Sequence, residues 1–271
     1  MHRTYSKFIY HGSKLHYSIY GEGDKVLFMF HGFGQTLKSL REIEETLKYD
    51  YKIYNFDLFF HGFSEWNHDD SQLSYDFWER MIQAFLDENG IHGFDLLGFS
   101  LGAKVCLATA ELFPDKIKQM YLIAPDGIKR SFVYNWSTLR PFKGIFRNLI
   151  LQPQLFYSLV RFSDFFKLLD KSVLRFASIQ MNSREKRRRL YYTWTVYKGL
   201  RPNIGELIRK LNERAISTNV FVGKYDRLIP LKHIQPVLNR LDKVTVNLLN
   251  AGHNNLLDAV SAHMEKEIAK R

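Results

Sequence analysis

The chain has 271 residues, 45% hydrophobic, which is enough to bury a substantial core, and it lacks the internal repeats and low-complexity runs of fibrous or disordered chains. One cysteine, Cys106, excludes an internal disulfide, and the first residues lack the apolar stretch of a signal peptide, so a soluble cytoplasmic protein is expected. The formal net charge of +11 favours anionic substrates or partners.

Predicted strands and helices alternate along the chain. The strands are expected near residues 5–10, 15–20, 26–30, 51–56, 94–97, 119–124, 216–222 and 244–249. Helices are expected near residues 74–88, 103–113 and 255–270. The first two strands read as a hairpin, and the later alternation predicts an α/β fold with a mostly parallel central sheet flanked by helices.

A serine flanked by glycines joins a predicted strand to a predicted helix in the run Gly98-Phe99-Ser100-Leu101-Gly102. A serine at the apex of so sharp a turn takes a strained backbone conformation, and glycine two residues before and after it avoids a clash between strand and helix. The hydroxyl then lies at the positive end of the helix, where developing negative charge is stabilised. The pattern predicts Ser100 as a nucleophile.

A serine hydroxyl needs a base and a carboxylate that orients the base, and on this kind of sheet the chain order is Ser, Asp, His. Asp226 follows the predicted strand at 216–222, and His253 follows the one at 244–249. Because side chains at the carboxyl ends of parallel strands meet in one crevice, we expect these residues to converge. His253 would accept the Ser100 proton, and Asp226 would hold the imidazole.

Two backbone N–H groups are expected to bind the oxyanion that forms during acyl transfer. One belongs to Leu101, the residue after the nucleophile. The other is expected from Phe33, in the turn His31-Gly32-Phe33-Gly34-Gln35 that follows a continuous apolar strand. The ring of His31 is expected to pin this turn rather than to react. Nothing in this predicted site calls for a cofactor or a metal ion.

These motifs resemble those of the α/β-hydrolase superfamily, in its capped branch of serine esterases, lipases and C–C hydrolases. The matching segments are His31-Gly32-Phe33-Gly34, Asp57 with His61-Gly62-Phe63-Ser64, Gly98 to Gly102, Gly223-Lys224-Tyr225-Asp226 and Gly252-His253. The resemblance implies the α/β-hydrolase fold with an inserted helical cap. Carboxylesterases and pimeloyl-acyl-carrier-protein methyl ester esterases share this motif style. Ser100 excludes relatives that need a carboxylate nucleophile, namely haloalkane dehalogenases and epoxide hydrolases.

Two positions leave alternatives open. Relatives carry Pro-Gly ahead of a His-Gly pair, where this chain has Phe59-Phe60. That loop lies near the site mouth in the family, so the pair either narrows the entrance or only covers the sheet edge. Some relatives keep their acid after the sixth strand, which makes Asp126 an alternative to Asp226, although Gly127 beside it favours a turn.

The resemblance divides the chain into a catalytic domain, residues 1–126 and 201–271, and a helical cap, residues 127–200. Charge divides at the same boundaries. Residues 1–126 carry 12 basic and 18 acidic side chains, residues 127–200 carry 15 and 3, and residues 201–271 carry 12 and 7. The predicted cap therefore holds nearly all of the excess positive charge.

A cationic cap beside a catalytic site raises the local concentration of anions. The cap could serve an anionic acyl substrate or an acidic carrier, such as acyl-carrier protein or a CoA thioester. It could also contact a membrane surface, or its helices could simply be solvated, with their aromatics packed together. Those aromatics are Phe132, Trp136, Phe142, Phe146, Phe156, Phe162, Phe165 and Phe166.

The densest basic run extends from Arg184 to Arg189. Asn182 is expected to cap a helix here, with Glu185 at the third helical position. Because successive helical residues are rotated by about 100°, Lys186 to Arg189 would wrap around the helix as a collar. A collar is poorly suited to following a phosphate backbone, so no nucleic-acid partner is expected.

The predicted reaction is acyl transfer to water through a covalent Ser100 intermediate, with carboxylic ester hydrolysis as the leading interpretation. Cleavage of a thioester or a C–C bond in an anionic substrate is an alternative. A small-molecule receptor in signalling that keeps the catalytic triad is another. Rapid multiple turnover would contradict the receptor interpretation.

Overall fold

The computed structural model describes residues 1–128, 144, 147–148, 152, 154 and 182–270. The chain divides into two compact units. The first unit comprises Met1–Asp69, Ser74–Lys129 and Leu200–Arg271, and the second comprises Asp70–Leu73 and Arg130–Gly199. The division of the chain into a catalytic domain and a cap stays a prediction, since much of 127–200 lies outside the described residues.

The first unit contains a sheet whose described strands number eight. They are β1 (Thr4–Tyr10), β2 (Ser13–Tyr20), β3 (Lys25–Phe30), β4 (Tyr51–Phe56), β5 (Asp95–Phe99), β6 (Gln119–Ile123), β7 (Ser217–Gly223) and β8 (Val244–Leu249). Their spatial order is β1-β2-β4-β3-β5-β6-β7-β8. The β1–β2 and β2–β4 pairs are antiparallel, and every pair from β4 to β8 is parallel. The predicted mostly parallel α/β fold is confirmed.

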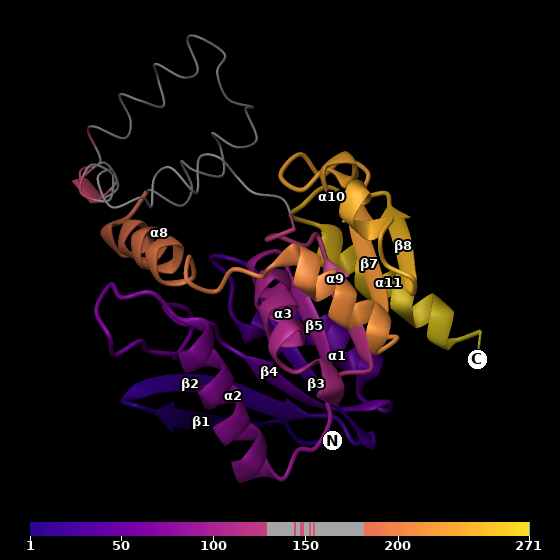
Figure 1. The fold of residues 1–271 in the computed structure, drawn as a ribbon, viewed down its shortest axis with the longest axis horizontal. Coiled ribbons are helices and arrows are strands. Elements are labelled where there is room, and N and C mark those ends of the chain that lie inside the picture. The colour runs from indigo at the N-terminus through magenta and orange to yellow at the C-terminus, as the bar shows by residue number, and fades with distance from the viewer. Residues whose placement is uncertain (129–143, 145–146, 149–151, 153, 155–181, 271) are drawn as a thin grey trace. The chain divides into compact units, whose positions relative to one another are not determined.

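Helices cover both faces of this sheet (Figure 1). One face carries α1 (Arg41–Leu47) and α11 (Leu256–Ile268), which pack on each other. The other carries α2 (Tyr75–Asn89), α3 (Leu101–Leu112) and α9 (Ile204–Glu213). The remaining described helices are η1 (Leu37–Leu40), η2 (Pro114–Lys116) and α10 (Leu231–Leu238), with α8 (Arg184–Val196) in the second unit.

Strand β3 shows how the core is built. Residues 27–30 are all 0% exposed, and successive side chains of a strand point to opposite faces. Leu27 and Met29 belong to the core that includes residues of α1 and α11. Phe28 lies on the other face, where its ring packs edge-on against Phe85 of α2 at 5.6 Å. The continuous apolar run therefore forms a strand buried on both sides, as predicted, and it holds the loop at its carboxyl end in place.

The predicted strands and helices agree with the structure to within about two residues at each end, but helix α8 begins differently from the prediction. Ser183, not Asn182, is its N-cap, and the Ser183 hydroxyl accepts a hydrogen bond from the Lys186 N–H at 3.2 Å. The prediction of Asn182 is wrong because two adjacent residues can both cap a helix, and the serine has the extended backbone that a cap requires.

Candidate active site

The turn between β5 and α3 carries Ser100 in a strained conformation. Its φ of 52° and ψ of −111° lie outside the regions that serine ordinarily occupies. The Ser100 N–H donates to the Ile123 carbonyl at 2.9 Å, and the Ser100 carbonyl accepts from the Ala103 N–H at 3.0 Å. These bonds to β6 and to the first turn of α3 hold the strained backbone. The turn has the geometry that the sequence predicted for it.

Close approach of the backbone explains the two flanking glycines. A Cβ atom on Gly98 would lie 2.5 Å from the carbonyl carbon of Gly102. One on Gly102 would lie 2.0 Å from the carbonyl oxygen of Phe30. Both obstacles are main-chain atoms, so no side-chain rotation could relieve the clash. Helix α3 can start this close to β3 and β5 only because both positions lack a side chain.

Asp226 and His253, on the loops after β7 and β8, are joined by a hydrogen bond. His253 Nδ1 lies 2.7 Å from Asp226 Oδ2, while Asp226 Oδ1 accepts from the N–H groups of Leu228 at 2.8 Å and Ile229 at 2.9 Å. Burial raises the pKa of Asp226, but these hydrogen bonds and the charge of His253 outweigh burial and lower it overall. Asp226 is therefore ionised at neutral pH and accepts the Nδ1 proton of His253.

The structure brings His253 to β5, the strand that leads into the Ser100 turn, but does not bond His253 to the serine. We call the turn Gly98 to Gly102 the elbow. The His253 ring packs against Phe99, with ring centres 5.0 Å apart, and Phe99 directly precedes Ser100. Within the described part of the chain, no hydrogen bond joins the Ser100 hydroxyl to His253. Such bonds are often long in structures without substrate and shorten only in the reacting complex.

The alternative acid, Asp126, has a different partner. Its Oδ1 accepts the Gly127 N–H at 2.7 Å, which is the turn that the glycine suggested. Its own N–H donates to the Ser100 carbonyl at 3.3 Å, so Asp126 lies beside the elbow. The carboxylate bonded to the His253 ring is that of Asp226.

The loop after β3 is fixed on both sides of Phe33. The Gly32 N–H donates to Gln35 Oε1 at 3.0 Å, and the Gly34 N–H donates to His61 Nε2 at 2.9 Å. Gly34 has a φ of 77°, which favours glycine. The N–H groups before and after Phe33 are thus held by side chains, which orients the peptide between them. Leu101, the other predicted donor, is the first residue of α3, where N–H groups lack an acceptor within the helix.

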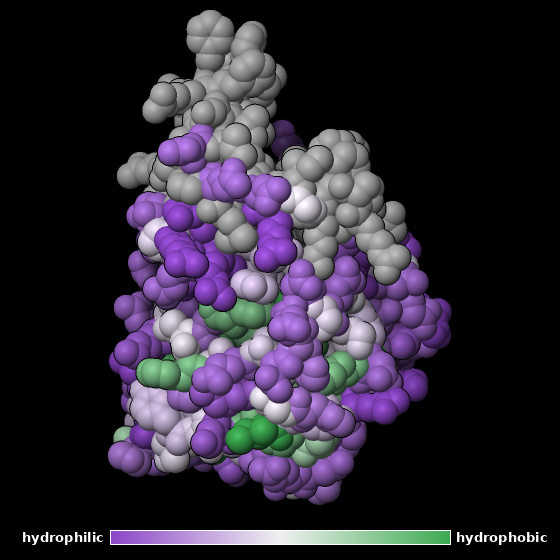
Figure 2. All heavy atoms as spheres, turned by 90° about the vertical axis from the view of Figure 1, so that its left-hand side faces the viewer, coloured by the Kyte–Doolittle hydropathy of each residue, from purple (hydrophilic) through white to green (hydrophobic). Residues whose placement is uncertain are grey.

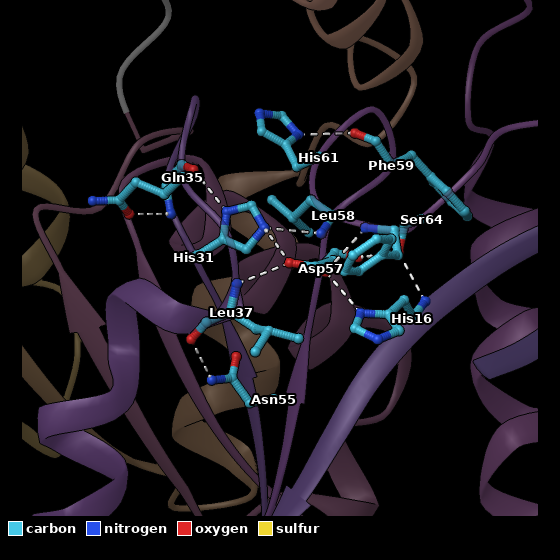
Figure 3. Close-up of polar contacts among 12 residues, drawn as sticks. His16, His31, Gln35, Leu37, Asn55, Asp57, Leu58, Phe59, His61 and Ser64 are labelled. Atoms are coloured by element: carbon cyan, nitrogen blue, oxygen red, sulfur yellow. Dashed lines mark hydrogen bonds and ion pairs between the residues drawn. The ribbon is translucent and has the colours of Figure 1, made fainter. Parts of the chain in front are cut away.

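Two imidazole rings join this loop to the loop after β4 (Figure 3). His31, which is 0% exposed, places Nδ1 2.8 Å from the Gly32 carbonyl and accepts the Leu58 N–H at Nε2 at 3.0 Å. His61 places Nδ1 3.0 Å from the Phe59 carbonyl. A neutral imidazole offers one donor and one acceptor, and these contacts assign Nδ1 as the donor in both rings. The predicted structural role of His31 fits this geometry.

A buried carboxylate, Asp57, ties the same loop to β2 and η1 (Figure 3). Its Oδ1 accepts the Leu37 N–H at 2.8 Å, and its Oδ2 lies 2.7 Å from His16 Nδ1. A Cβ on Gly62 would lie 1.9 Å from that Oδ2, so glycine is needed there. Asp57 and His61 belong to a segment that carries the resemblance to α/β-hydrolases, but the sequence alone gave them no role. His16 lies 41 residues before Asp57, so only the tertiary structure reveals the pair.

Phe59 and Phe60 differ in their environments. Phe59 is 0% exposed and packs on Trp66 with ring centres 5.0 Å apart, so it belongs to the core and does not narrow an entrance. Phe60 is half-buried and has a φ of 69°, the left-handed conformation that glycine adopts at lowest cost. This backbone is consistent with the Pro-Gly pair that relatives carry at this place.

Helix α3 buries two reactive side chains behind the serine. Lys104 is 5% exposed, and burial lowers the pKa of Lys104 to about 8, with Arg201 adding to the effect and Asp126 opposing it. Cys106 is 0% exposed, and burial raises the pKa of its thiol. Cys106 therefore fits the predicted small hydrophobic residue rather than a nucleophile.

The eight aromatic residues predicted for the cap, from Phe132 to Phe166, lie outside the described residues. In the part of the chain that is described, no cluster of three or more His, Cys, Asp or Glu side chains could hold a metal ion. None of the helices described there is both long and apolar enough to cross a membrane.

A mostly parallel sheet with a strained serine turn, and with a paired aspartate and histidine at the carboxyl ends of its strands, defines an α/β enzyme of the hydrolase class. A family model described as the α/β hydrolase fold matches residues 25–260. The chain belongs to this family. A search of the curated proteins found no match.

Solved structures of several hydrolases are similar to this chain. A hydrolase from Pseudomonas aeruginosa is 17% identical, with a TM-score of 0.69, and the match covers 98% of this chain and 97% of that one. The thioesterase domain from the curacin biosynthetic pathway is 17% identical, with a TM-score of 0.66 and coverages of 99% and 100%. The haloalkane dehalogenase DbeA from Bradyrhizobium elkani is 17% identical, with a TM-score of 0.63 and coverages of 99% and 97%. At these identities the likeness concerns the fold.

Proposed function

We propose that this protein is a serine hydrolase that cleaves carboxylic esters through a covalent acyl-Ser100 intermediate. The observation that carries the proposal is the 2.7 Å hydrogen bond between His253 Nδ1 and Asp226 Oδ2, next to the strand that ends in the strained Ser100 turn. Because Nδ1 donates to an ionised carboxylate, Nε2 is the basic nitrogen of the ring.

In the proposed reaction, His253 Nε2 removes the hydroxyl proton while Ser100 Oγ attacks the ester carbonyl carbon. The N–H groups of Phe33 and Leu101 bind the resulting oxyanion. When the tetrahedral intermediate collapses, the bond to the alcohol breaks, and the alcohol takes the proton from His253. Water then attacks the acyl-serine by the same route and releases the acid. Asp226 keeps the imidazole in the required tautomer and stabilises its charged form.

Thioester hydrolysis is a second candidate, because it uses the same acyl-enzyme and only the leaving group differs. It is favoured by the charge of residues 127–200, which carry 15 basic and 3 acidic side chains, since many acyl thioesters carry an anionic group on the thiol. Haloalkane dehalogenation is not proposed, since the elbow residue of this chain is a serine rather than a carboxylate.

A panel of aryl esters and acyl thioesters of graded chain length tests the proposal. Wild type should turn over repeatedly on at least one ester, and Ser100→Ala should lose at least about a thousandfold in kcat. Ser39→Ala, a half-buried serine on η1, is the matched control and should keep the wild-type rate. Full turnover by Ser100→Ala would refute the proposal.

A second pair of variants tests the orienting acid. Asp226→Asn removes the acceptor for the Nδ1 proton and should lower kcat by about 10⁴-fold. Asp126→Asn makes the same chemical change beside the elbow and should cost far less, because its carboxylate is bonded to Gly127 instead. The reverse order of effects would show that Asp126 is the acid. His253→Ala should be as damaging as Asp226→Asn, whereas the exposed His92→Ala should be neutral.

A further inference from the structure

Gln35 holds the buried residue Gly32 at both of its peptide groups. The Gly32 N–H donates to the side-chain oxygen Gln35 Oε1 at 3.0 Å (Figure 3), and the Gly32 carbonyl accepts the main-chain N–H of Gln35 at 3.2 Å. Because a backbone N–H can only donate, the carboxamide atom that faces it is the oxygen. One residue therefore restrains the chain on either side of the Gly32 Cα atom.

The close packing at Gly32 explains why this restraint is needed. A Cβ atom on Gly32 would lie 2.7 Å from Cδ1 of Phe99, the residue before Ser100. The Phe99 ring is 4% exposed and packs on His253, so it has no open space to move into. Glycine is therefore required at this position, and glycine has the least restricted backbone of all residues. The two hydrogen bonds from Gln35 replace the steric restraint that a side chain on residue 32 would have given.

The conformation of Gly32 determines the direction of the Phe33 N–H. The Gly32 carbonyl and the Phe33 N–H belong to one planar trans peptide, so they point in opposite directions. Besides the Gln35 N–H, the ring of His31 holds this carbonyl, with Nδ1 at 2.8 Å. A change in the backbone dihedral angles of Gly32 would turn this peptide, and the Phe33 N–H would turn with it.

We propose that Gln35 is a positioning residue of the hydrolase reaction, whose side chain keeps the Phe33 N–H aimed at the oxyanion. Gln35 acts through Gly32 and does not itself contact the reacting atoms. The Gly32 N–H is buried, and a buried N–H needs an acceptor. Without the Gln35 carboxamide, the loop shifts until this N–H finds another acceptor, and the Phe33 N–H shifts with it. This inference rests on the proposed function, because an oxyanion forms only if Ser100 attacks an acyl group.

Kinetics of Gln35→Met, which has a side chain of similar length without the carboxamide, test the proposal. On an ester that the wild type hydrolyses, kcat should fall by at least about tenfold and KM should change by less than about threefold, because the oxyanion develops only after binding. A trifluoromethyl ketone provides a second measurement. The Ser100 oxygen adds to its carbonyl carbon, His253 takes the hydroxyl proton, and the carbonyl oxygen becomes the oxyanion. Its affinity should fall by the same factor as kcat. A purely structural role would lower the melting temperature without this split between kcat and KM.

Gln83→Met is the matched control, because it makes the same chemical change on α2 and should keep the wild-type kcat. Figure 2 looks onto the side of the first unit that carries β1, β2 and α2, where the surface is mostly hydrophilic.

Hydrogen exchange of the Gly32 amide, followed by NMR without substrate, tests the restraint independently of catalysis. Gln35→Met should speed this exchange by at least about tenfold, whereas Gln35→Glu keeps an acceptor oxygen and should preserve the wild-type rate. Unchanged exchange in Gln35→Met, or a kcat equal to that of Gln83→Met, would overturn the proposal. If the wild type hydrolysed no ester while the Gly32 exchange still depended on Gln35, the proposed function would fail and Gln35 would be a structural restraint only.

Discussion

Replacing Lys104 by methionine should stabilise the protein at neutral pH. Lys104 lies on α3, four residues after Ser100, and is 5% exposed. Burial penalises its charged form and lowers the pKa of Lys104 to about 8 from the ordinary value of 10.5, even though Asp126 opposes the shift. Methionine has a similar length and no charge to desolvate, so it can fill the same space.

The magnitude follows from the pKa. Each pKa unit corresponds to about 1.4 kcal/mol, so holding Lys104 protonated in the folded state costs roughly 3 kcal/mol of the free energy of unfolding. Between the folded and unfolded pKa values the unfolded chain binds the extra proton, so the wild type gains stability as pH rises from about 8 to about 10.5. Below about pH 8 the cost is present in full, and above about pH 10.5 it vanishes.

Urea unfolding of wild type and Lys104→Met across this pH range tests the prediction. The variant should be more stable by roughly 3 kcal/mol at about pH 7, and the two curves should converge as pH rises towards about 10.5. Lys118→Met is the control, because it makes the same chemical change at an exposed lysine. It should show no such convergence with the wild type. Parallel curves for wild type and Lys104→Met, or a less stable variant at neutral pH, would refute the assignment of a destabilising buried ammonium group.

Three further changes probe the site. Gly102→Ala forces a Cβ to within 2.0 Å of the Phe30 carbonyl oxygen. The free energy of unfolding should therefore fall by several kcal/mol, and kcat should fall by at least about tenfold. A melting temperature equal to that of the wild type would contradict this close approach. His61→Phe removes the acceptor of the Gly34 N–H, which helps to orient the Phe33 peptide. Steady-state kinetics should therefore show a loss in kcat that exceeds the rise in KM, and a crystal structure of the variant should show a displaced loop. Asp226→Asn should lower the free energy of unfolding at neutral pH, because the lowered pKa of Asp226 means that its charged form favours folding. The difference from wild type should shrink as pH falls below about 4. Urea unfolding of both proteins at a series of acidic pH values measures this difference.

Much of the fold could be predicted because local patterns agree with it. The apolar run at 26–30 is a strand buried on both faces, and the glycines around Ser100 mark a turn where strand and helix come close. Helix α9 was not anticipated, although Asn203 accepts a hydrogen bond from the Glu206 N–H at 3.4 Å and so caps it. That signal is present in the sequence but is short, and polar residues at such spacings are common in loops.

The predicted site residues were found by their place after strands, which parallel strands convert into spatial proximity. That rule identifies Asp226 and His253, and in the structure the His253 ring is hydrogen-bonded to the Asp226 carboxylate. It does not reveal His16, which reaches Asp57 from an antiparallel strand far earlier in the chain. Nor does it reveal Gln35, whose side chain turns back on the Gly32 N–H within its own loop. These supporting contacts depend on tertiary packing rather than on chain order.

The arginines on α8 are a second case in which the sequence predicts only part of an arrangement. A run of basic residues predicts a helix surrounded by charge, and helical spacing already places Arg184, Arg187 and Arg188 on one side. In the structure these three side chains and Arg147 line one cavity, and no periodicity relates Arg147, from a distant part of the sequence, to the helix. Only the structure therefore distinguishes a cavity from a solvated face.

The most direct test of the central claim is to trap the acyl-enzyme. Wild-type protein treated with a fluorophosphonate, which reacts with activated serines, should gain one adduct, and peptide mass spectrometry should locate it on Ser100. His253→Ala should lose this labelling, whereas His92→Ala should keep it. An adduct on another residue, or equal labelling of wild type and His253→Ala, would contradict an acyl-serine mechanism in which His253 activates Ser100.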